Sequence, residues 1–308
     1  MNLTYTVKPD EIFDNLKELL KVKFQISDRL LIKLKKNNRL FINDKKAAIY
    51  DVPKAGDLIS INIDFEEDES NFPATKMDLE IVYEDDAYLV INKPAGIPVH
   101  PSLNHYENSL ANGVKYHFQY IGLKRKIRPV NRLDKNTSGL VVFAKNEYIQ
   151  EYLIREMKTG EFKKEYISLC NGIFKNNSGI IDAPIARKQD SIIERCVNSK
   201  GASAITLYEV VGYNTLQNET YSIVNCELKT GRTHQIRVHM QHLGHPILGD
   251  TLYGTTSTLI NRQALHCSTI SFIHPISLIK VSYNSILPND MRALFPKSWH
   301  FCHFMLTL

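Results

Sequence analysis

The sequence predicts an α+β fold in which a small N-terminal module precedes a larger, strand-rich domain. Helical spacing of apolar residues is concentrated at the start of the chain, whereas apolar–polar alternation dominates the later part. An acidic run beginning at residue 66 separates the two patterns. With 308 residues and 43% apolar content, the chain is long enough to bury one large core and a small one.

The composition favours a globular protein of the cytoplasm. No apolar run approaches the roughly 18 residues that a membrane helix needs, and the start of the chain lacks a signal-peptide core. The formal charge of +5 permits a polyanionic partner without requiring one. Scattered cysteines, never in a Cys-x-x-Cys pair, predict buried thiols and neither a disulfide framework nor a zinc cage: Cys170, Cys196, Cys226, Cys267 and Cys302.

Residues 1–65 are predicted to form the small module, with two helices followed by two strands. The first helix is expected over residues 9–24 because its apolar residues are spaced by three and four: Ile12, Phe13, Leu16, Leu19 and Leu20. The second is expected to begin after Ser27 as N-cap and to bury Leu30, Leu31 and Leu34. The strands are expected at residues 39–42 and 58–63.

Lysines crowd the end of the second predicted helix. Lys33, Lys35 and Lys36 could contact RNA, because the two-helix, strand-ended pattern resembles the αL RNA-binding domain first known from a small-subunit ribosomal protein. They could equally complement the helix dipole and solvate the surface. The sequence of this segment leaves both interpretations open.

Residues 66–76 are predicted to be an acidic linker, and residues 77–308 the second domain. That domain is expected to open with two strands joined by an acidic turn, within residues 79–96. Further strands are expected at 202–211 and 221–228, and the clearest helix at 147–157.

Asp134 is the first candidate for chemistry. It lies between the cations Arg132 and Lys135, which favour an ionised carboxylate. The Thr-Ser-Gly sequence that ends at Gly139 then leads into an apolar strand at 140–144. By themselves these residues are also ordinary turn chemistry.

Tyr166 is the second candidate. It shares one face of a predicted strand at 162–171 with Lys164. A tyrosine in this setting can stack on a nucleobase while nearby lysines meet phosphate. A core aromatic beside solvated lysines is the commoner explanation for an isolated strand.

Arg237 is the third candidate, within a helix predicted from His234 to Leu243. Thr233 could cap this helix and Gly244 could end it. A buried stripe is expected at Ile236, Met240 and Leu243, and Arg237 lies beside that stripe, so it should point toward the domain.

Four histidines in the same stretch invite a metal site, but their spacing does not favour one. The sequence has neither His-x3-His nor His-Glu-x-x-His there, and no acidic residue lies inside the cluster of His234, His239, His242 and His245. Glycine-rich nucleotide loops and a Gly-x-Ser-x-Gly elbow are also missing from the sequence. The remaining candidates are one carboxylate, one aromatic residue on a strand and one inward arginine. They suit a substrate that is neutral, can stack on an aromatic ring and is linked to anionic groups, such as a nucleotide in RNA.

Several ordered motifs resemble the large-subunit-rRNA class A (RluA/RluD type) pseudouridine synthases over residues 79–288. They are Arg132-Leu-Asp134 with Thr-Ser-Gly139, Lys164-x-Tyr166, Gly231-Arg-Thr-His-Gln-Ile-Arg237-Val-His239 and His245-Pro-Ile-Leu-Gly-Asp250. The opening Asn-Lys-Pro-Ala-Gly96, His100-Pro-Ser102, Leu265-His266 and His274-Pro275 add to the likeness.

The resemblance implies a mixed, mainly antiparallel central sheet with a basic cleft across it. It also implies isomerisation of uridine in structured RNA, without metal or cofactor, with ribosomal RNA as the expected substrate and transfer RNA as the other candidate. Asp134 would act on the ribose as nucleophile or as base of a glycal route, and Tyr166 would stack on the base and take part in removing its C5 proton. Arg237 would pair with Asp134, and Arg132 would hold the place of the flipped nucleotide.

One departure from the family pattern is visible, because Asn131 stands where many members have histidine. We expect a monomer. A non-catalytic RNA-binding or ribosome-assembly protein is the alternative from another class, and a histidine-metal hydrolase is the weaker enzyme alternative. The motifs assign no role to the tail at residues 299–308.

Overall fold

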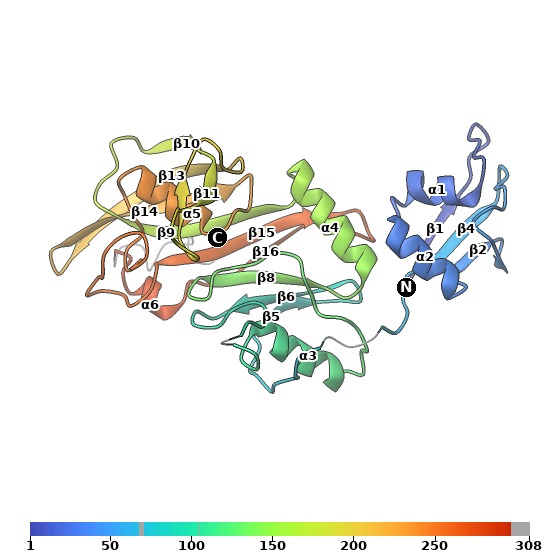
Figure 1. Cartoon of the computed structure of the whole chain (residues 1–308), viewed down its shortest axis with the longest axis horizontal. Coiled ribbons are helices and arrows are strands. Elements are labelled where there is room, and N and C mark those ends of the chain that lie inside the picture. Colours follow the sequence, from blue (N-terminus) through green and yellow to red (C-terminus); the bar gives the residue numbers. More distant parts are fainter. Residues whose placement is uncertain (68–70, 104, 297–308) are drawn as a thin grey trace.

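The computed structural model describes residues 1–67, 71–103 and 105–296 (Figure 1). Its first 62 residues contain a sheet of order β1-β4-β2-β3, formed by Asn2–Thr6, Leu58–Asn62, Leu40–Ile42 and Lys45–Lys46. Helices α1 (Leu16–Lys23) and α2 (Asp28–Lys36) pack on it through buried leucines. The two expected strands are confirmed as β2 and β4, whereas β1 was not predicted.

The first helix is shorter than predicted. It begins after Asn15, whose side chain accepts a hydrogen bond from the Glu18 backbone N–H at 3.0 Å. Ile12 therefore lies outside the helix and is 91% exposed, so its assignment to the apolar stripe was wrong. The N-cap Asn15 lies inside the apolar pattern, so the helix begins there and the apolar residues before it are not helical.

The second helix is confirmed in its cap and its buried face. The Ser27 hydroxyl accepts a hydrogen bond from the Leu30 N–H at 3.2 Å, and Leu30, Leu31 and Leu34 are buried. The same hydroxyl donates a hydrogen bond to the carboxylate of Glu151 at 2.7 Å. The cap of α2 is thus also a contact with α4 (Glu147–Thr159).

The larger sheet runs in the order β10-β13-β14-β9-β15-β8-β6-β5, and β16 and β7 pair with β15 and β8 (Figure 1). In the described part of the chain its strand pairs are antiparallel except β8–β15. The mainly antiparallel central sheet is therefore confirmed. The strand bounds are β5 Ile81–Glu84, β6 Tyr88–Lys93, β7 Arg128–Pro129, β8 Ser138–Ala144, β9 Lys163–Asn171, β10 Ser178–Asp182, β13 Ile205–Leu216, β14 Glu219–Leu228, β15 Leu265–Ile273 and β16 Lys280–Asn284. A separate pair is β11 Ile185–Arg187 with β12 Arg195–Val197.

Four helices accompany these strands: α3 Leu110–Tyr120, α4, α5 Gln235–His242 and α6 Asn289–Arg292. The helix predicted at 147–157 is confirmed as α4. Helix α3 was missed, because Gly113 interrupts its apolar stripe and lowers helix propensity. The glycine is used for close packing, since a Cβ there would lie 3.0–3.1 Å from side chains of Met77 and Leu79.

Helices α2 and α4 join the N-terminal sheet to the central one. Lys33 forms an ion pair with Glu147, and Arg29 Nε lies 3.1 Å from the same carboxylate. Glu67, from the predicted acidic linker, makes a two-pronged ion pair with Arg128 at 2.6 and 2.7 Å. These ion pairs therefore stabilise the contact between α2 and α4 and join the predicted linker to β7.

Within the described ranges, no helix has the length and apolar character needed to cross a membrane. Three cysteines are buried as predicted, namely Cys170, Cys226 and Cys267, whereas Cys196 is partly exposed because it lies on the outer hairpin β11–β12. Cys302 and the tail at 299–308 lie outside the described residues.

Candidate active site

A cleft of about 620 Å³ crosses the central sheet beside β8, β9 and the start of α5. It collects the residues that the sequence singled out, Arg132, Asp134, Lys164, Tyr166 and Arg237. Among the described residues that line the cleft, basic side chains outnumber acidic ones: Arg132, Lys163, Lys164, Lys229, Arg232 and Arg237 against Asp134 and Glu227. The excess of positive charge can therefore attract a polyanion to the cleft.

Asp134 lies in the short connection between β7 and β8. Three side chains hold this connection through its backbone and Thr137. The Lys93 ammonium donates to the Lys135 carbonyl at 3.1 Å, Arg262 donates to the Asn136 carbonyl at 3.1 Å, and Gln263 donates to the Thr137 hydroxyl at 3.3 Å. The aspartate is thus carried by a restrained turn at the edge of a strand.

Lys93 is buried completely, and its ammonium also donates to the carbonyls of Pro94 and Ile97 at 2.7 and 2.9 Å. Burial, with the positive charge of Arg262, lowers the pKa of Lys93 to about 7, although the charge of Asp134 acts in the opposite direction. The lysine of the Asn-Lys-Pro-Ala-Gly96 sequence therefore joins the turn after β6 to the turn that carries Asp134.

The turn reaches β8 through Gly139, where the parallel partner β15 approaches closely. Gly139 has φ +113°, and a Cβ there would overlap the backbone of Cys267. The structure begins β8 at Ser138, so two residues of the predicted Thr-Ser-Gly turn already belong to the strand. Glycine is required here both for the backbone conformation and for the close strand contact.

Asn131 is buried and faces β8, away from solvent. Its amide donates to the Leu140 carbonyl at 3.0 Å, and its carbonyl oxygen accepts from the Val142 N–H at 2.9 Å. The side chain thereby imitates one extra strand residue beside β8. Asn131 is 5% exposed, and its two hydrogen bonds to β8 anchor the segment before Asp134.

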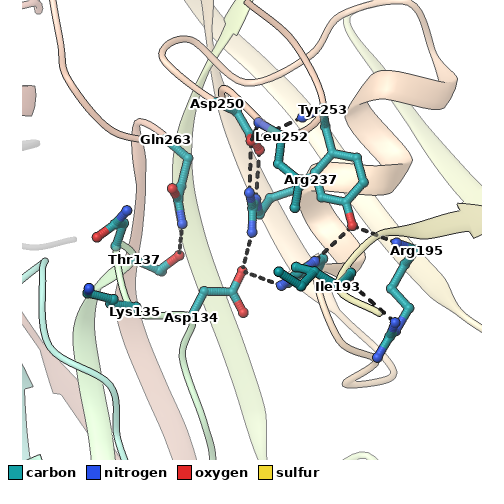
Figure 2. Close-up of polar contacts among 12 residues, drawn as sticks. Asp134, Lys135, Thr137, Ile193, Arg195, Arg237, Asp250, Leu252, Tyr253 and Gln263 are labelled. Carbon is teal, nitrogen blue, oxygen red and sulfur yellow. Dashed lines mark hydrogen bonds and ion pairs between the residues drawn. The ribbon is translucent and has the colours of Figure 1, made fainter. Parts of the chain in front are cut away.

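The Asp134 carboxylate is paired with Arg237 (Figure 2). Arg237 Nη1 donates to Asp134 Oδ2 at 3.0 Å, while Nε and Nη2 donate to Asp250 at 2.7 and 2.8 Å. Arg132 and Lys135, the cations on either side of Asp134 in the sequence, are exposed, and in the described part of the chain the cation in contact with its carboxylate is Arg237. The inward orientation predicted for Arg237 is confirmed, since the residue is 7% exposed.

Asp250 completes this arrangement, although sequence reasoning gave it no role. Its carboxylate is buried and holds two nitrogens of the guanidinium, which leaves the third directed at Asp134. Burial disfavours the charged form of Arg237 and by itself would lower its pKa. The hydrogen bonds and negative charges of Asp250 and then Asp134 outweigh this effect, so the pKa of the arginine is raised. The signal in the sequence was the conserved-looking order of His245-Pro-Ile-Leu-Gly-Asp250, which carried Asp250 without indicating its partner.

Helix α5 positions Arg237, but its N-terminus differs from the prediction. The capping residue is His234, in a left-handed conformation with φ 58° and ψ 21°, and not Thr233. The end of the helix is as predicted, because Gly244 follows it with φ +84°. Ile236 and Met240 are buried and Leu243 packs partly against the core.

Tyr166 and Lys164 extend from β9 toward the same cleft. Tyr166 is 5% exposed and Lys164 is 8% exposed. Burial raises the pKa of Tyr166 well above 10, with contributions from Cys267 and from the charge of Asp134. Burial lowers the pKa of Lys164. The tyrosine therefore presents a protonated phenol near the carboxylate.

Arg132 lies at the exposed rim of the cleft. His100 lines the same cleft, and burial together with the charge of Arg132 lowers the pKa of His100. Of the four clustered histidines, His239 is bonded to Thr206 and the Ala183 carbonyl, and His245 stacks on Phe174. In the ranges that the structure covers, no three metal-ligating side chains of His, Cys, Asp or Glu come together.

Comparison with known proteins identifies the family. The family model for RNA pseudouridylate synthases matches residues 87–242, which include Asp134, Tyr166 and Arg237. The uncharacterised RNA pseudouridine synthase YjbO of Bacillus subtilis strain 168 is 40% identical over 276 residues, covering 89% of this chain and 96% of that protein. The chain belongs to the RNA pseudouridine synthase family. The resemblance drawn from its motifs is thereby confirmed.

Other relatives of this synthase have more specific names. Ribosomal large subunit pseudouridine synthase D of Zymomonas mobilis is 37% identical over 257 residues, covering 79% of each chain. The protein of that name from Escherichia coli O6:H1 is 32% identical over 313 residues, covering 96% of this chain and 93% of that one. Among solved structures, human RNA pseudouridylate synthase domain containing 1 shares the fold, with a TM-score of 0.59 at 23% identity, covering 77% of this chain and 98% of that one.

Proposed function

We propose that Asp134 is the essential residue with which this enzyme converts uridine to pseudouridine. The observation that supports this role is a carboxylate in a basic cleft that is held on Oδ2 by the buried Arg237. No hydrogen bond from the described residues reaches Oδ1, so that oxygen is available to a substrate. It could attack the anomeric carbon or remove a ribose proton, and both routes need an ionised carboxylate.

Tyr166, Arg237 and Arg132 would bind and place the nucleotide. Tyr166 presents an aromatic face at the cleft and would stack on the extruded base. Because its pKa is raised well above 10, its phenol would act as a hydrogen-bond donor before any role in moving the C5 proton. Arg237 would orient Asp134, and the exposed Arg132 would contact the RNA from which the uridine has left.

The test is the Asp134→Asn variant, assayed by tritium release from RNA labelled at uridine C5. Conversion should fall by more than about a thousandfold, the scale of loss when a nucleophile or an essential base is removed. The matched control is Asp182→Asn, an exposed aspartate at the end of the edge strand β10 and outside the cleft lining, which should keep full activity. Full conversion by Asp134→Asn would refute the proposed role.

We propose ribosomal RNA as the substrate, with transfer RNA as the competing class. The support is that curated relatives at 32–37% identity are named ribosomal large subunit pseudouridine synthase D. Pseudouridine mapping in a deletion strain, complemented with wild type or Asp134→Asn, would decide between the classes. A site lost from ribosomal RNA and restored only by wild type supports the proposal, whereas restoration only in transfer RNA overturns it.

We also propose that residues 1–65 act as an RNA-binding module and that the enzyme works as a cytoplasmic monomer. The exposed Lys35 and Lys36 are available for RNA, whereas Lys33 is engaged with Glu147. Light scattering measures the mass in solution, and cell fractionation locates the enzyme.

A further inference from the structure

His234 occupies a strained position at the edge of the cleft. Its backbone has φ 58° and ψ 21°, a left-handed conformation that costs free energy for a residue with a Cβ. Such conformations persist where the surroundings hold them in place, and they are concentrated at functional sites. The position of this side chain therefore calls for a reason beyond the start of a helix.

The neighbouring Gln235 supplies the support. Its Oε1 accepts hydrogen bonds from the Thr230 hydroxyl at 2.8 Å and from the Arg232 N–H at 2.9 Å. Its Nε2 donates to the Ile205 carbonyl and to the Thr206 hydroxyl, both at 3.0 Å. This buried side chain ties the turn before α5 to β13 and leaves His234 little freedom.

Tyr253 determines which ring nitrogen of His234 carries the proton. The Arg195 backbone N–H donates to the Tyr253 hydroxyl oxygen at 2.8 Å, and that oxygen lies 2.8 Å from His234 Nδ1. Among the described residues, Nδ1 is the acceptor that the structure places within reach of the tyrosine proton. We therefore assign Nδ1 as the acceptor of the tyrosine proton, which places the proton of the neutral ring on Nε2.

That second nitrogen faces the proposed catalytic carboxylate. His234 Nε2 lies 3.9 Å from Asp134 Oδ2, the oxygen that already accepts from Arg237 at 3.0 Å. Burial lowers the pKa of His234, and Arg237 and Arg195 lower it further against the opposing charges of Asp134 and Asp250. The ring is thus a neutral donor at neutral pH.

We propose that His234 is a positioning residue for Asp134, and that its Nε2–H donates to Oδ2 once a uridine fills the cleft. A movement of about 1 Å brings 3.9 Å to hydrogen-bond distance. Arg237 and His234 then hold Oδ2 from two sides and direct Oδ1 toward the ribose. Tyr253 sets the tautomer and also places its ring 4.9 Å from the Arg237 guanidinium. The inference rests on the proposed role of Asp134.

The experiment compares four variants of the full chain by steady-state kinetics of tritium release. His234→Phe removes the donor, and kcat should fall roughly 10- to 100-fold with little change in KM, the equivalent of one hydrogen bond to a charged group. His234→Gln retains a donor near Nε2 and should stay within about fivefold of wild type. Tyr253→Phe keeps the aromatic ring but frees the tautomer, and kcat should fall by about three- to tenfold.

The His234→Gly variant distinguishes loss of the hydrogen-bond donor from an effect of backbone strain. Glycine adopts the left-handed conformation freely, so this variant removes the ring without adding strain. Its kcat should fall as far as that of His234→Phe, with a circular dichroism spectrum like that of wild type. In addition, ¹⁵N NMR of histidine-labelled wild type should show the His234 signals of a neutral ring with the proton on Nε2.

Several results would overturn the inference. They are a kcat within twofold of wild type for His234→Phe or His234→Gly, a loss confined to KM, or a proton on Nδ1 in the wild-type spectrum. Asp134→Asn is measured alongside. If Asp134→Asn is inactive while His234→Phe and His234→Gly are fully active, only the positioning role of His234 is refuted. If Asp134→Asn is active, the proposed function is refuted as well.

Discussion

At the scale of single residues, Arg237 connects two carboxylates with different tasks. Asp250 is fully buried and takes two of the three guanidinium hydrogen bonds, whereas Asp134 is about a quarter exposed and takes the third. A planar, forked guanidinium can make this arrangement and an ammonium cannot. One arginine thus joins a buried carboxylate that fixes its position to a carboxylate that reaches the cleft.

The Arg237→Met variant should lose both stability and activity. Removing the cation leaves the Asp250 carboxylate buried without its opposite charge, with only the backbone N–H groups of Leu252 and Tyr253 still donating to it, which costs about 3–5 kcal/mol of unfolding free energy. The double variant Arg237→Met/Asp250→Asn removes the uncompensated charge and should regain most of that stability in urea titrations. Its conversion of RNA should remain low, because Asp134 still lacks its donor. Recovery of full activity in the double variant would contradict this division.

At the scale of elements, the β8–β15 contact positions the turn that carries Asp134. His266 on β15 is fully buried between two hydroxyls, with Nδ1 3.0 Å from Ser138 Oγ and Nε2 2.9 Å from Ser285 Oγ. Ser138 begins β8, four residues after Asp134. The parallel strands β8 and β15 lie so close that no side chain fits at Gly139. The neighbouring contact between them is made by the neutral His266.

His266 should make the folded state sensitive to acid. Burial lowers its pKa from 6.5 to about 4, so below pH 6.5 the unfolded chain binds a proton that the folded chain refuses. Stability from this group is present above pH 6.5 and is lost as the pH falls toward 4, by about 2 kcal/mol between pH 7 and pH 5.

Urea unfolding of wild type and His266→Gln at several pH values measures this contribution. The variant should lose the pH-dependent part, so its free energy of unfolding should change less than that of wild type between pH 7 and pH 5. His242→Gln, at an exposed histidine of α5, is the matched control and should follow wild type. Parallel curves for wild type and His266→Gln would exclude His266 as the source.

At the scale of the whole molecule, α4 lies between the N-terminal elements and the central sheet (Figure 1). Its first turn carries Glu147, which pairs with Lys33 of α2, and its last turn brings Met157 to the cleft wall. The helix has 13 residues, a length of about 20 Å. RNA that reaches from the cleft along this helix would meet the exposed Lys35 and Lys36.

The Lys33–Glu147 pair should show measurable coupling. Glu147 is 6% exposed, and screening by water is therefore weaker than at an open surface. A double-mutant cycle with Lys33→Met and Glu147→Gln should give a coupling of about 1 kcal/mol in urea unfolding. The more exposed pair Lys188–Glu194 is the control and should couple more weakly. Equal coupling in both cycles would contradict the expected effect of burial at Glu147.

The sequence by itself determined the candidates and the periodic elements. The order of motifs selected Asp134, Tyr166 and Arg237, and alternation predicted β9, β13 and β14, because a strand's two faces are a local property of the chain. The Ser27 cap was equally local. The prediction from sequence failed where an apolar pattern is interrupted. Ile12 lies before the N-cap of α1, and α3 was missed because Gly113 interrupts its apolar stripe.

Only the tertiary structure decided which charges meet. Arg237 lies 103 positions from Asp134 in the sequence, and Lys33 lies 114 positions from Glu147. The order of strands brings these groups together, and no local spacing encodes that order. The same holds for Tyr253, which reaches His234 across a turn and fixes its proton, so that a residue first weighed as a metal ligand became a donor directed at the carboxylate.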